Sequence, residues 1–165
     1  MSTFQKIHPC LWFNGNAEEA ADFYIGIFPG SGIDHKVITS EEVSAGSGVP
    51  AGTVLTVDFH LGDHRFLGLN GGPQFKFTEA ISLVINCKDQ QEVDHYWEKL
   101  GEGGPEESKQ CGWLRDKFGV SWQVVPERMT EMVTDKDTTK VDRMMAAMMH
   151  MKKLDIAELE RAFNG

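Results

Sequence analysis

Two places in this sequence carry side chains whose type and spacing suit chemistry. His8 lies near the start of the first apolar segment, where an imidazole could serve as the first ligand of a metal ion. Asp58 and His60 are two residues apart in the segment TVDFHLG, so in a strand they would share one face and could form an acid–base pair. No serine or cysteine nucleophile motif accompanies them, and we favour a solvated strand face for this pair.

Composition narrows the classes of partner. The chain has 165 residues and a formal net charge of −9, without a run of lysine or arginine, which argues against nucleic acid. No apolar stretch approaches the roughly 20 residues of a membrane helix, and the N-terminus does not resemble a signal peptide. Three cysteines without a CxxC pair argue against a disulfide framework or a zinc knuckle. We therefore expect a cytoplasmic protein with no membrane or nucleic-acid partner.

The elements that would position these side chains repeat along the chain. A polar residue followed three positions later by glutamate predicts the start of two helices, at Asn16 with Glu19 and at Asp89 with Glu92. The apolar stripes that follow match at the same spacing. Five pairs of residues differ by 73 positions: Asn16 and Asp89, Glu19 and Glu92, Phe23 and Tyr96, Tyr24 and Trp97, and Ile27 and Leu100. This common offset indicates an internal duplication.

Each predicted helix is preceded by a strand and followed by β-type segments. The leading strands cover about 6–14 and 80–87. In the first half, the later segments are IDHKVIT, GTVLTVDFHLG and HRFLGLN; in the second, they are about 105–110, CGWLRDKFG and VSWQVVP. The pattern predicts an α+β fold of two tandem β-α-β-β-β modules that form a concave mixed sheet. We interpret the Gly/Ser-rich segment 41–51 as a mobile loop.

After Pro126 the composition changes, because seven of the eight methionines lie at or beyond Met129. Val141, Met144, Met145 and Met148 form a helical stripe, which we interpret as a packing face against the sheet or a second subunit, with a ligand-gating lid as the alternative. We therefore assign residues 1–127 to a two-module domain, with modules of about 1–78 and 79–127, and residues 128–165 to a C-terminal helical extension.

Several stretches resemble one known family. The paired modules are similar to the vicinal oxygen chelate superfamily of glyoxalases, bleomycin-resistance proteins and extradiol dioxygenases. Four stretches resemble its PhnB-like branch, which is often labelled 3-demethylubiquinone-9 3-methyltransferase domain. They are CLWFNGNAEEAADFYIGIFPGS, FLGLNGGPQFKFTEAISLVINC, DQQEVDHYWEKL and CGWLRDKFGVSWQVVP. The resemblance implies a concave sheet around a ligand. In many superfamily members, four inward side chains also hold a divalent metal that chelates adjacent oxygens of the substrate.

The ligand positions that the resemblance implies are poorly filled. Gln123 follows the turn D-x-x-G at the position of a glutamate ligand, and Ser82 falls at the ligand position of the strand AISLVINC. The strand HRFLGLN offers Leu67, Gly68 or Asn70. A neutral amide binds metal more weakly than a carboxylate. We predict no tight metal site and no cofactor, with His8 and Gln123 as weak candidate ligands.

The repeat also tests which way His8 faces. Strand residues alternate between faces, so a shift of one residue moves a side chain to the opposite face. Subtracting 73 from Ser82 gives Pro9, and His8 then pairs with Ile81 on the helix-covered face. A bulge or an extra turn residue around Asn14-Gly15-Asn16 would return His8 to the cleft.

The same alternation predicts the walls of the cleft. We expect a ligand pocket lined by Phe13, Asn70, Phe75, Phe77, Ser82, Val84, Asn86, Trp113, Arg115 and Gln123. For Phe75, Phe77 and Trp113, ordinary packing is an equal alternative. An aromatic cleft with a few amides and hydroxyls suits a small, largely planar organic ligand.

We therefore expect a homodimeric small-molecule-binding protein of this superfamily, whose ligand the sequence does not name. Three alternatives stay open. The chain could be a metal-dependent lyase, isomerase or dioxygenase that uses His8 and Gln123, or a partner-binding module that uses the Met-rich C-terminal helices. It could also be a methyltransferase, as the family label implies. However, no strand-G-x-G-x-x-G-helix fingerprint for a nucleotide-type methyl donor is present.

Overall fold

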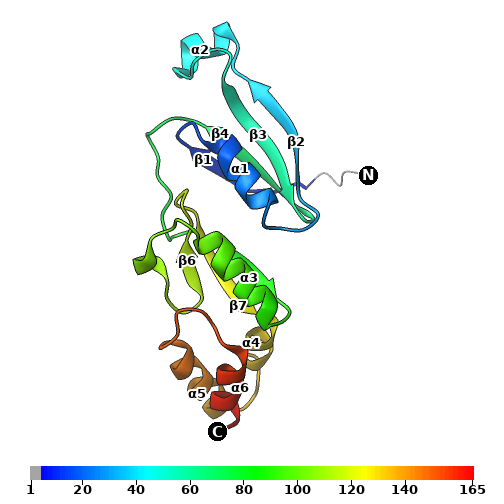
Figure 1. Cartoon of the computed structure of the whole chain (residues 1–165), viewed down its shortest axis with the longest axis vertical. Coiled ribbons are helices and arrows are strands. Elements are labelled where there is room, and N and C mark those ends of the chain that lie inside the picture. Colours follow the sequence, from blue (N-terminus) through cyan, green and yellow to red (C-terminus); the bar gives the residue numbers. More distant parts are fainter. Residues whose placement is uncertain (1–4) are drawn as a thin grey trace. The chain divides into compact units, whose positions relative to one another are not determined.

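A computed structural model describes residues 5–165, and the chain divides into two compact units (Figure 1). The first unit ends at Lys76 and the second covers Phe77–Gly165. The second unit contains the second sheet module together with the C-terminal helices. Each unit combines helices with a mixed sheet, so the chain has the α+β fold of two modules with added C-terminal helices.

The first unit contains a four-stranded mixed sheet in the order β1-β4-β3-β2. β1 is parallel to β4, and the other two pairs are antiparallel. Its elements are β1 (Cys10–Phe13), α1 (Ala17–Ile25), β2 (Gly32–Ile38), α2 (Glu41–Ser47), β3 (Val54–Leu61) and β4 (His64–Asn70). With α2 as an insertion, this is the predicted β-α-β-β-β order.

Helix α1 covers one face of this sheet. The ring of Tyr24 stacks on Phe59 at 6.2 Å between centroids, and Phe59 stacks on Phe66 at 5.4 Å. A Cβ on Gly68 would lie 3.2 Å from the Cβ of Ala17, so glycine lets the helix approach the sheet closely. Burial of each of these aromatic side chains contributes about 1.5–3 kcal/mol to stability, and this core holds the module together.

Segment 41–51, predicted to be a mobile loop, contains a short helix instead. Helix α2 begins after Ser40, whose Oγ accepts a hydrogen bond from the N–H of Val43, and ends at Gly48 with a φ of 75°. An N-cap serine and a left-handed glycine are favourable helix ends. The loop prediction was wrong because it was based on the glycine and serine content of the segment. It did not consider that Ser40 and Gly48 lie at the two ends of a helix.

The second unit contains a three-stranded sheet in the order β5-β7-β6, with β5 parallel to β7 and β6 antiparallel to it. Its sheet module comprises β5 (Leu83–Cys87), α3 (Gln90–Gly101), the 3-10 helix η1 (Glu106–Ser108), β6 (Trp113–Arg115) and β7 (Ser121–Pro126). The predicted cap of α3 is confirmed, since Asp89 accepts from the N–H of Glu92. The strand predicted at about 105–110 is wrong. Pro105 begins η1, and the Ser108 hydroxyl bonds back to its carbonyl at 2.7 Å.

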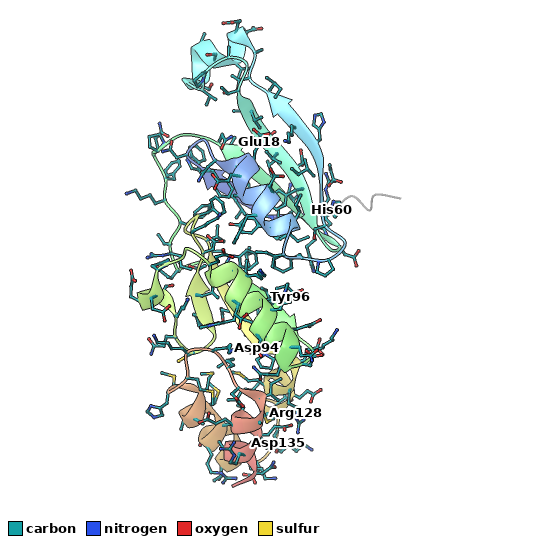
Figure 2. The ribbon with its side chains drawn as sticks, viewed as in Figure 1. Glu18, His60, Asp94, Tyr96, Arg128 and Asp135 are labelled. Carbon is teal, nitrogen blue, oxygen red and sulfur yellow. The ribbon has the colours of Figure 1, made fainter. Side chains whose placement is uncertain are left out.

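Three C-terminal helices complete the second unit: α4 (Glu127–Met132), α5 (Thr138–Met148) and α6 (Ile156–Asn164). Most of the methionine stripe packs among these helices rather than on the sheet. Met144 is fully buried in a cluster with Leu159 and Phe163, while Met145 is 36% exposed. Arg128 on α4 also bonds Glu160 of α6 at 2.7 Å (Figure 2). No helix among the described residues is long and apolar enough to cross a membrane.

Polar contacts attach these helices to the sheet module. Gln90 at the start of α3 donates to the carbonyl of Leu154 and accepts from the N–H of Ile156. Lys153 pairs with Asp94 of α3 at 2.7 Å, and this contact lowers the pKa of the Asp94 carboxyl. The segment between α5 and α6 therefore has a defined position beside the sheet.

Candidate functional site

The resemblance implies two ligand positions in the second module, Ser82 and Gln123. These two side chains form a hydrogen bond with each other. Gln123 lies in β7 beside Val84 of β5, and Ser82 directly precedes β5. The Nε2 of Gln123 donates to the Oγ of Ser82 at 2.8 Å. Both groups are uncharged, and each retains hydrogen-bonding capacity for a further polar group.

These residues belong to the sheet face opposite α3, which we call the open face of the second unit. Along β5, Val84 and Asn86 are exposed, whereas Leu83, Ile85 and Cys87 are more buried. Along β6 and β7, Leu114, Trp122 and Val124 are buried toward the core. The alternation and the pairing of Trp113 with Gln123 define the open face: Ser82, Val84, Asn86, Trp113, Arg115, Ser121, Gln123 and Val125.

A groove of about 530 Å³ runs over part of this open face, and we call it the sulfur-lined groove. Sheet residues form one wall, and residues of α4, α5 and the adjoining loops form the other. Its lining residues are Glu79, Ser108, Gln110, Cys111, Trp113, Gln123, Val125, Met129, Met148, Met149 and Leu154. Its mixture of apolar and amide side chains is typical of sites for small organic molecules.

Sequence reasoning missed the helical wall of this groove. The methionines were interpreted as a packing face, with a ligand-gating lid as the alternative, and Cys111 was not connected with them. The signal was the position of the methionines, all of which except Met1 follow the sheet strands. A stripe on one helix does not say which loop faces it, because that depends on the tertiary contacts.

Arg115 and Asn86 lie on the same open face but outside the groove. Arg115 pairs with Glu79 at 3.3 Å between Nη1 and Oε1, and both side chains are at least one-third exposed. Such an exposed pair contributes little to stability. Asn86 lies instead in a separate shallow pocket with residues of and just after α4, among them Thr130 and Thr134.

The D-x-x-G turn positions the groove rather than lining it. Asp116 is only 1% exposed, and its Oδ1 accepts from the N–H groups of Phe118 and Val120. Its Oδ2 accepts from the indole N–H of Trp122 at 2.8 Å. Gly119 adopts a φ of 93°, which favours glycine. The turn therefore sets the register of β6 against β7, and with it the pairing of Trp113 with Gln123.

Phe75 and Phe77 lie in different units. Phe75 is 66% exposed and meets the ring of Trp12 edge-on at 4.8 Å, within the first unit. Phe77 is half-buried in the second unit, where a Cβ on Gly119 would lie 3.6 Å from its ring. Phe77 therefore lies next to the turn that orders β6 and β7.

Asn70 has a structural task in the first unit. Its Oδ1 accepts from the N–H of Ala17 at 2.9 Å, and its Nδ2 donates to the carbonyl of Val54 at 2.9 Å. It thereby caps α1 from β4, whereas Asn16, the predicted cap, makes no such side-chain bond. Because Asn70 is 6% exposed and its oxygen is already engaged, it is a poor metal ligand.

The predicted facing of Phe13 is wrong. Phe13 is 3% exposed, and its ring lies with Ala17 beside Gly68, on the face covered by α1. The reason is the turn Asn14-Gly15, which places two residues between Phe13 and the helix N-cap Asn16, against one residue between Cys87 and its N-cap Asp89. Gly15 adopts a φ of 87°, so the extra residue fits. The strands are therefore offset by 74 positions and the helices by 73.

This turn also changes the interpretation of His8. In β1, Cys10 and Trp12 lie on the face opposite Leu11 and Phe13, which are buried. The Pro9 carbonyl still accepts from the N–H of Leu67, so the alternation reaches back to the start of β1. His8 precedes the first residue of β1 and is exposed, and the same alternation would place it with Cys10 and Trp12, away from α1. Its predicted equivalent, Ile81, is not packed either, since it is 79% exposed.

Asp58 and His60 do not form an acid–base pair with each other. The Oδ1 of Asp58 lies 3.6 Å from the Nη2 of Arg65. The Nδ1 of His60 lies 3.1 Å from the Oδ1 of Asp34 (Figure 2). All four side chains are partly exposed. These contacts agree with a solvated strand face.

Comparison with known proteins finds one matching family model and solved structures with a similar fold. The family model described as 3-demethylubiquinone-9 3-methyltransferase matches residues 5–125. The PhnB protein from Bacillus cereus is 35% identical with a TM-score of 0.62, and the match covers 74% of this chain and 99% of that one. A Pseudomonas aeruginosa protein shares the fold at 23% identity and a TM-score of 0.56, over 74% of this chain and 97% of its own. No curated protein matches the sequence closely.

Proposed function

We propose that this chain, which belongs to the 3-demethylubiquinone-9 3-methyltransferase family, binds a small organic molecule in the sulfur-lined groove without a tightly held divalent metal. The observation that carries the proposal is the 2.8 Å hydrogen bond between Gln123 and Ser82. In many superfamily members the positions of Ser82 and Gln123 hold a metal ion. In this chain they form a neutral hydrogen-bonded pair at the edge of an apolar groove.

The residues of the groove favour an organic ligand. Trp113 and Val125 supply flat apolar surface from the sheet, and Met129 supplies it from α4. Methionine side chains adapt to ligands of different shape. Gln123 adds an amide that can orient a carbonyl or hydroxyl group. These properties match a small, largely planar molecule that carries a few polar groups.

Metal chemistry has weak support in the described residues. No three His, Cys, Asp or Glu side chains between residues 5 and 165 gather closely enough to hold an ion. Ser82 and Gln123 have no charge to offset the dehydration of a divalent cation.

The family description names methyl transfer, but the residues of this chain do not support that reaction. The sequence has no strand-G-x-G-x-x-G-helix fingerprint for a nucleotide-type methyl donor. Its described strands form sheets of four and three strands, each with one parallel pair, rather than a doubly wound parallel sheet. We therefore propose ligand binding and not methyl transfer.

The binding proposal is tested with the fluorescent aromatic probe 8-anilinonaphthalene-1-sulfonate. We expect Val125→Asp to weaken binding of the probe at least about tenfold, because the carboxylate lies in the groove where the ring would pack. Val84→Asp is the matched control, since it adds the same charge at a 54% exposed position on the same sheet face, outside the groove. Equal weakening by both variants, or no probe binding to the unaltered protein, would overturn the proposal.

Titration with Ni²⁺, Zn²⁺, Mn²⁺ and Fe²⁺ tests whether the protein lacks a tightly held divalent metal. We expect no 1:1 complex of micromolar affinity with any of these ions. A complex of that affinity that disappears in Gln123→Ala would overturn the metal-free part of the proposal.

We also propose that the protein is a cytoplasmic homodimer. The edge strand β2 supports a dimer, because Val37 is 40% and Ile38 is 54% exposed there. Light scattering after size exclusion should give the mass of two chains of 18.4 kDa each. A mass of one chain at micromolar concentration contradicts the dimer.

A further inference from the structure

Two sulfur atoms meet at one end of the sulfur-lined groove. The Sγ of Cys111 lies 4.0 Å from the Sδ of Met149. Cys111 is partly exposed and Met149 is 55% exposed, so neither belongs to the buried core. Two more thioethers, those of Met129 and Met148, line the same groove. Four soft donor atoms therefore border one open cavity.

The two segments that carry this sulfur pair are held together by the backbone. The N–H of Cys111 donates to the carbonyl of Met151, and the N–H of Gly112 donates to that of Lys152, both at 2.8 Å. Cys111 has a φ of 51°, a left-handed conformation that is uncommon outside glycine. Its thiol is thus set against the end of α5 by the fold itself, before any ligand arrives.

We propose that Cys111 and Met149 bind a soft monovalent cation, Cu(I) or Ag(I), with Met148 or Met129 as the third ligand. Thiolate and thioether sulfur select such ions over hard divalent ones. If the metal–sulfur distance is close to the about 2.3 Å of a zinc–thiolate bond, two sulfurs at about 120° around an ion lie about 4 Å apart, similar to the 4.0 Å between Cys111 and Met149. On binding, the S–H bond of Cys111 breaks, the sulfur keeps the electron pair to bond the ion, and the proton passes to water.

The other two cysteines lack these features. Cys87 is fully buried, and burial together with nearby Glu92 raises the pKa of its thiol to about 12. Cys10 is exposed, but it lies in the first unit, where no methionine occurs among the described residues. The cation site shares the groove and Met129 with the organic ligand proposed above, but it uses the sulfur atoms alone.

The test is an anaerobic Ag(I) titration of the full chain followed by native mass spectrometry, in a Cys10→Ser background that removes the exposed competing thiol. We expect one Ag(I) per chain. Cys111→Ser should abolish this complex, and Met149→Leu should weaken it at least about tenfold. Met145→Leu, at a partly exposed position on α5 outside the groove, is the matched control and should bind as the background protein does.

Two results would overturn the proposal. If Met149→Leu and Met145→Leu bind Ag(I) equally, Cys111 acts as a lone thiol without a built site. If Cys111→Ser still binds one ion as tightly as before, the site lies elsewhere. Met149→Leu removes no buried group and should keep the fold, as its circular dichroism spectrum would show, so the test stands even if Cys111→Ser fails to fold.

Discussion

Replacement of Asp116 by asparagine tests the account of the turn that positions the groove. The carboxylate accepts two backbone hydrogen bonds at Oδ1 and one from the Trp122 indole at Oδ2. Asparagine has the same shape but only one acceptor oxygen. If that oxygen keeps the two backbone bonds, the new NH₂ group faces the indole N–H, and two donors oppose each other in a buried site.

The magnitude follows from the number of unsatisfied groups. Trp122 is 2% exposed, so water does not reach its indole N–H easily. A buried donor without a partner costs about 1–3 kcal/mol, and the two retained bonds lose the assistance of the charge. We expect Asp116→Asn to lower the free energy of unfolding by about 2–4 kcal/mol.

Urea denaturation followed by circular dichroism measures this difference, and a double-mutant cycle isolates its cause. Trp122→Phe removes the indole donor, so Asp116→Asn should cost at least about 1 kcal/mol less in that background. Asp142→Asn, at an exposed position on α5, is the control and should change stability by less than about 0.5 kcal/mol. An equal cost of Asp116→Asn in both backgrounds would refute the reasoning.

Three further predictions concern the first unit and the buried thiol. Asn70→Ala leaves the N–H of Ala17 and a strand carbonyl without their partner, so urea denaturation should show a loss of about 2–4 kcal/mol. Gly71→Ala places a Cβ 2.3 Å from the Trp12 ring, which must move, and its fluorescence spectrum should shift while stability falls by about 1–3 kcal/mol. The Cys87 thiol, with its pKa raised from 9.0 to about 12, should stay unlabelled by iodoacetamide at pH 8. Because the unfolded chain loses this proton at lower pH, stability should fall as pH rises from about 9 to about 12, by up to about 1.4 kcal/mol per pH unit.

Each of these has a clear contrary result. Unchanged stability of Asn70→Ala would mean that water or Asn16 caps the helix equally well. An unshifted fluorescence spectrum in Gly71→Ala would mean that the Trp12 ring lies elsewhere. For the thiol, Cys87→Ala should flatten the alkaline decline, and an identical slope would assign that decline to other groups.

Local patterns in the sequence were sufficient for much of the fold. The stripe of Tyr24 and its neighbours and the Asp89 cap depend on residues within one or two turns, so they predict helices without tertiary information. Predictions failed where they were based on the composition of a segment and not on the positions of its residues. The segment 41–51 is rich in glycine and serine, yet Ser40 and Gly48 are at positions that begin and end a helix.

The residues of the candidate site were harder to predict than the helices, because their positions depend on tertiary contacts. Asn70 is a polar residue at a strand end in the sequence, and only the packing of β4 against α1 shows that it caps a helix 53 residues away. The approach of Met149 to Cys111 likewise requires the loop after α5 to bond to the loop before β6. Neither contact leaves a periodic signal in the sequence.

The sequence by itself determined the repeated strand and helix and the two modules, because these follow from residue type and from spacing within each module. The ligand positions Ser82 and Gln123 came instead from the family resemblance. Only the tertiary structure decided the phase of β1. One extra residue at Asn14-Gly15 reverses the face of Phe13 relative to the repeat. The physical reason is the two-residue period of a strand: a shift of one residue leaves the hydrophobic composition unchanged but exchanges the two faces.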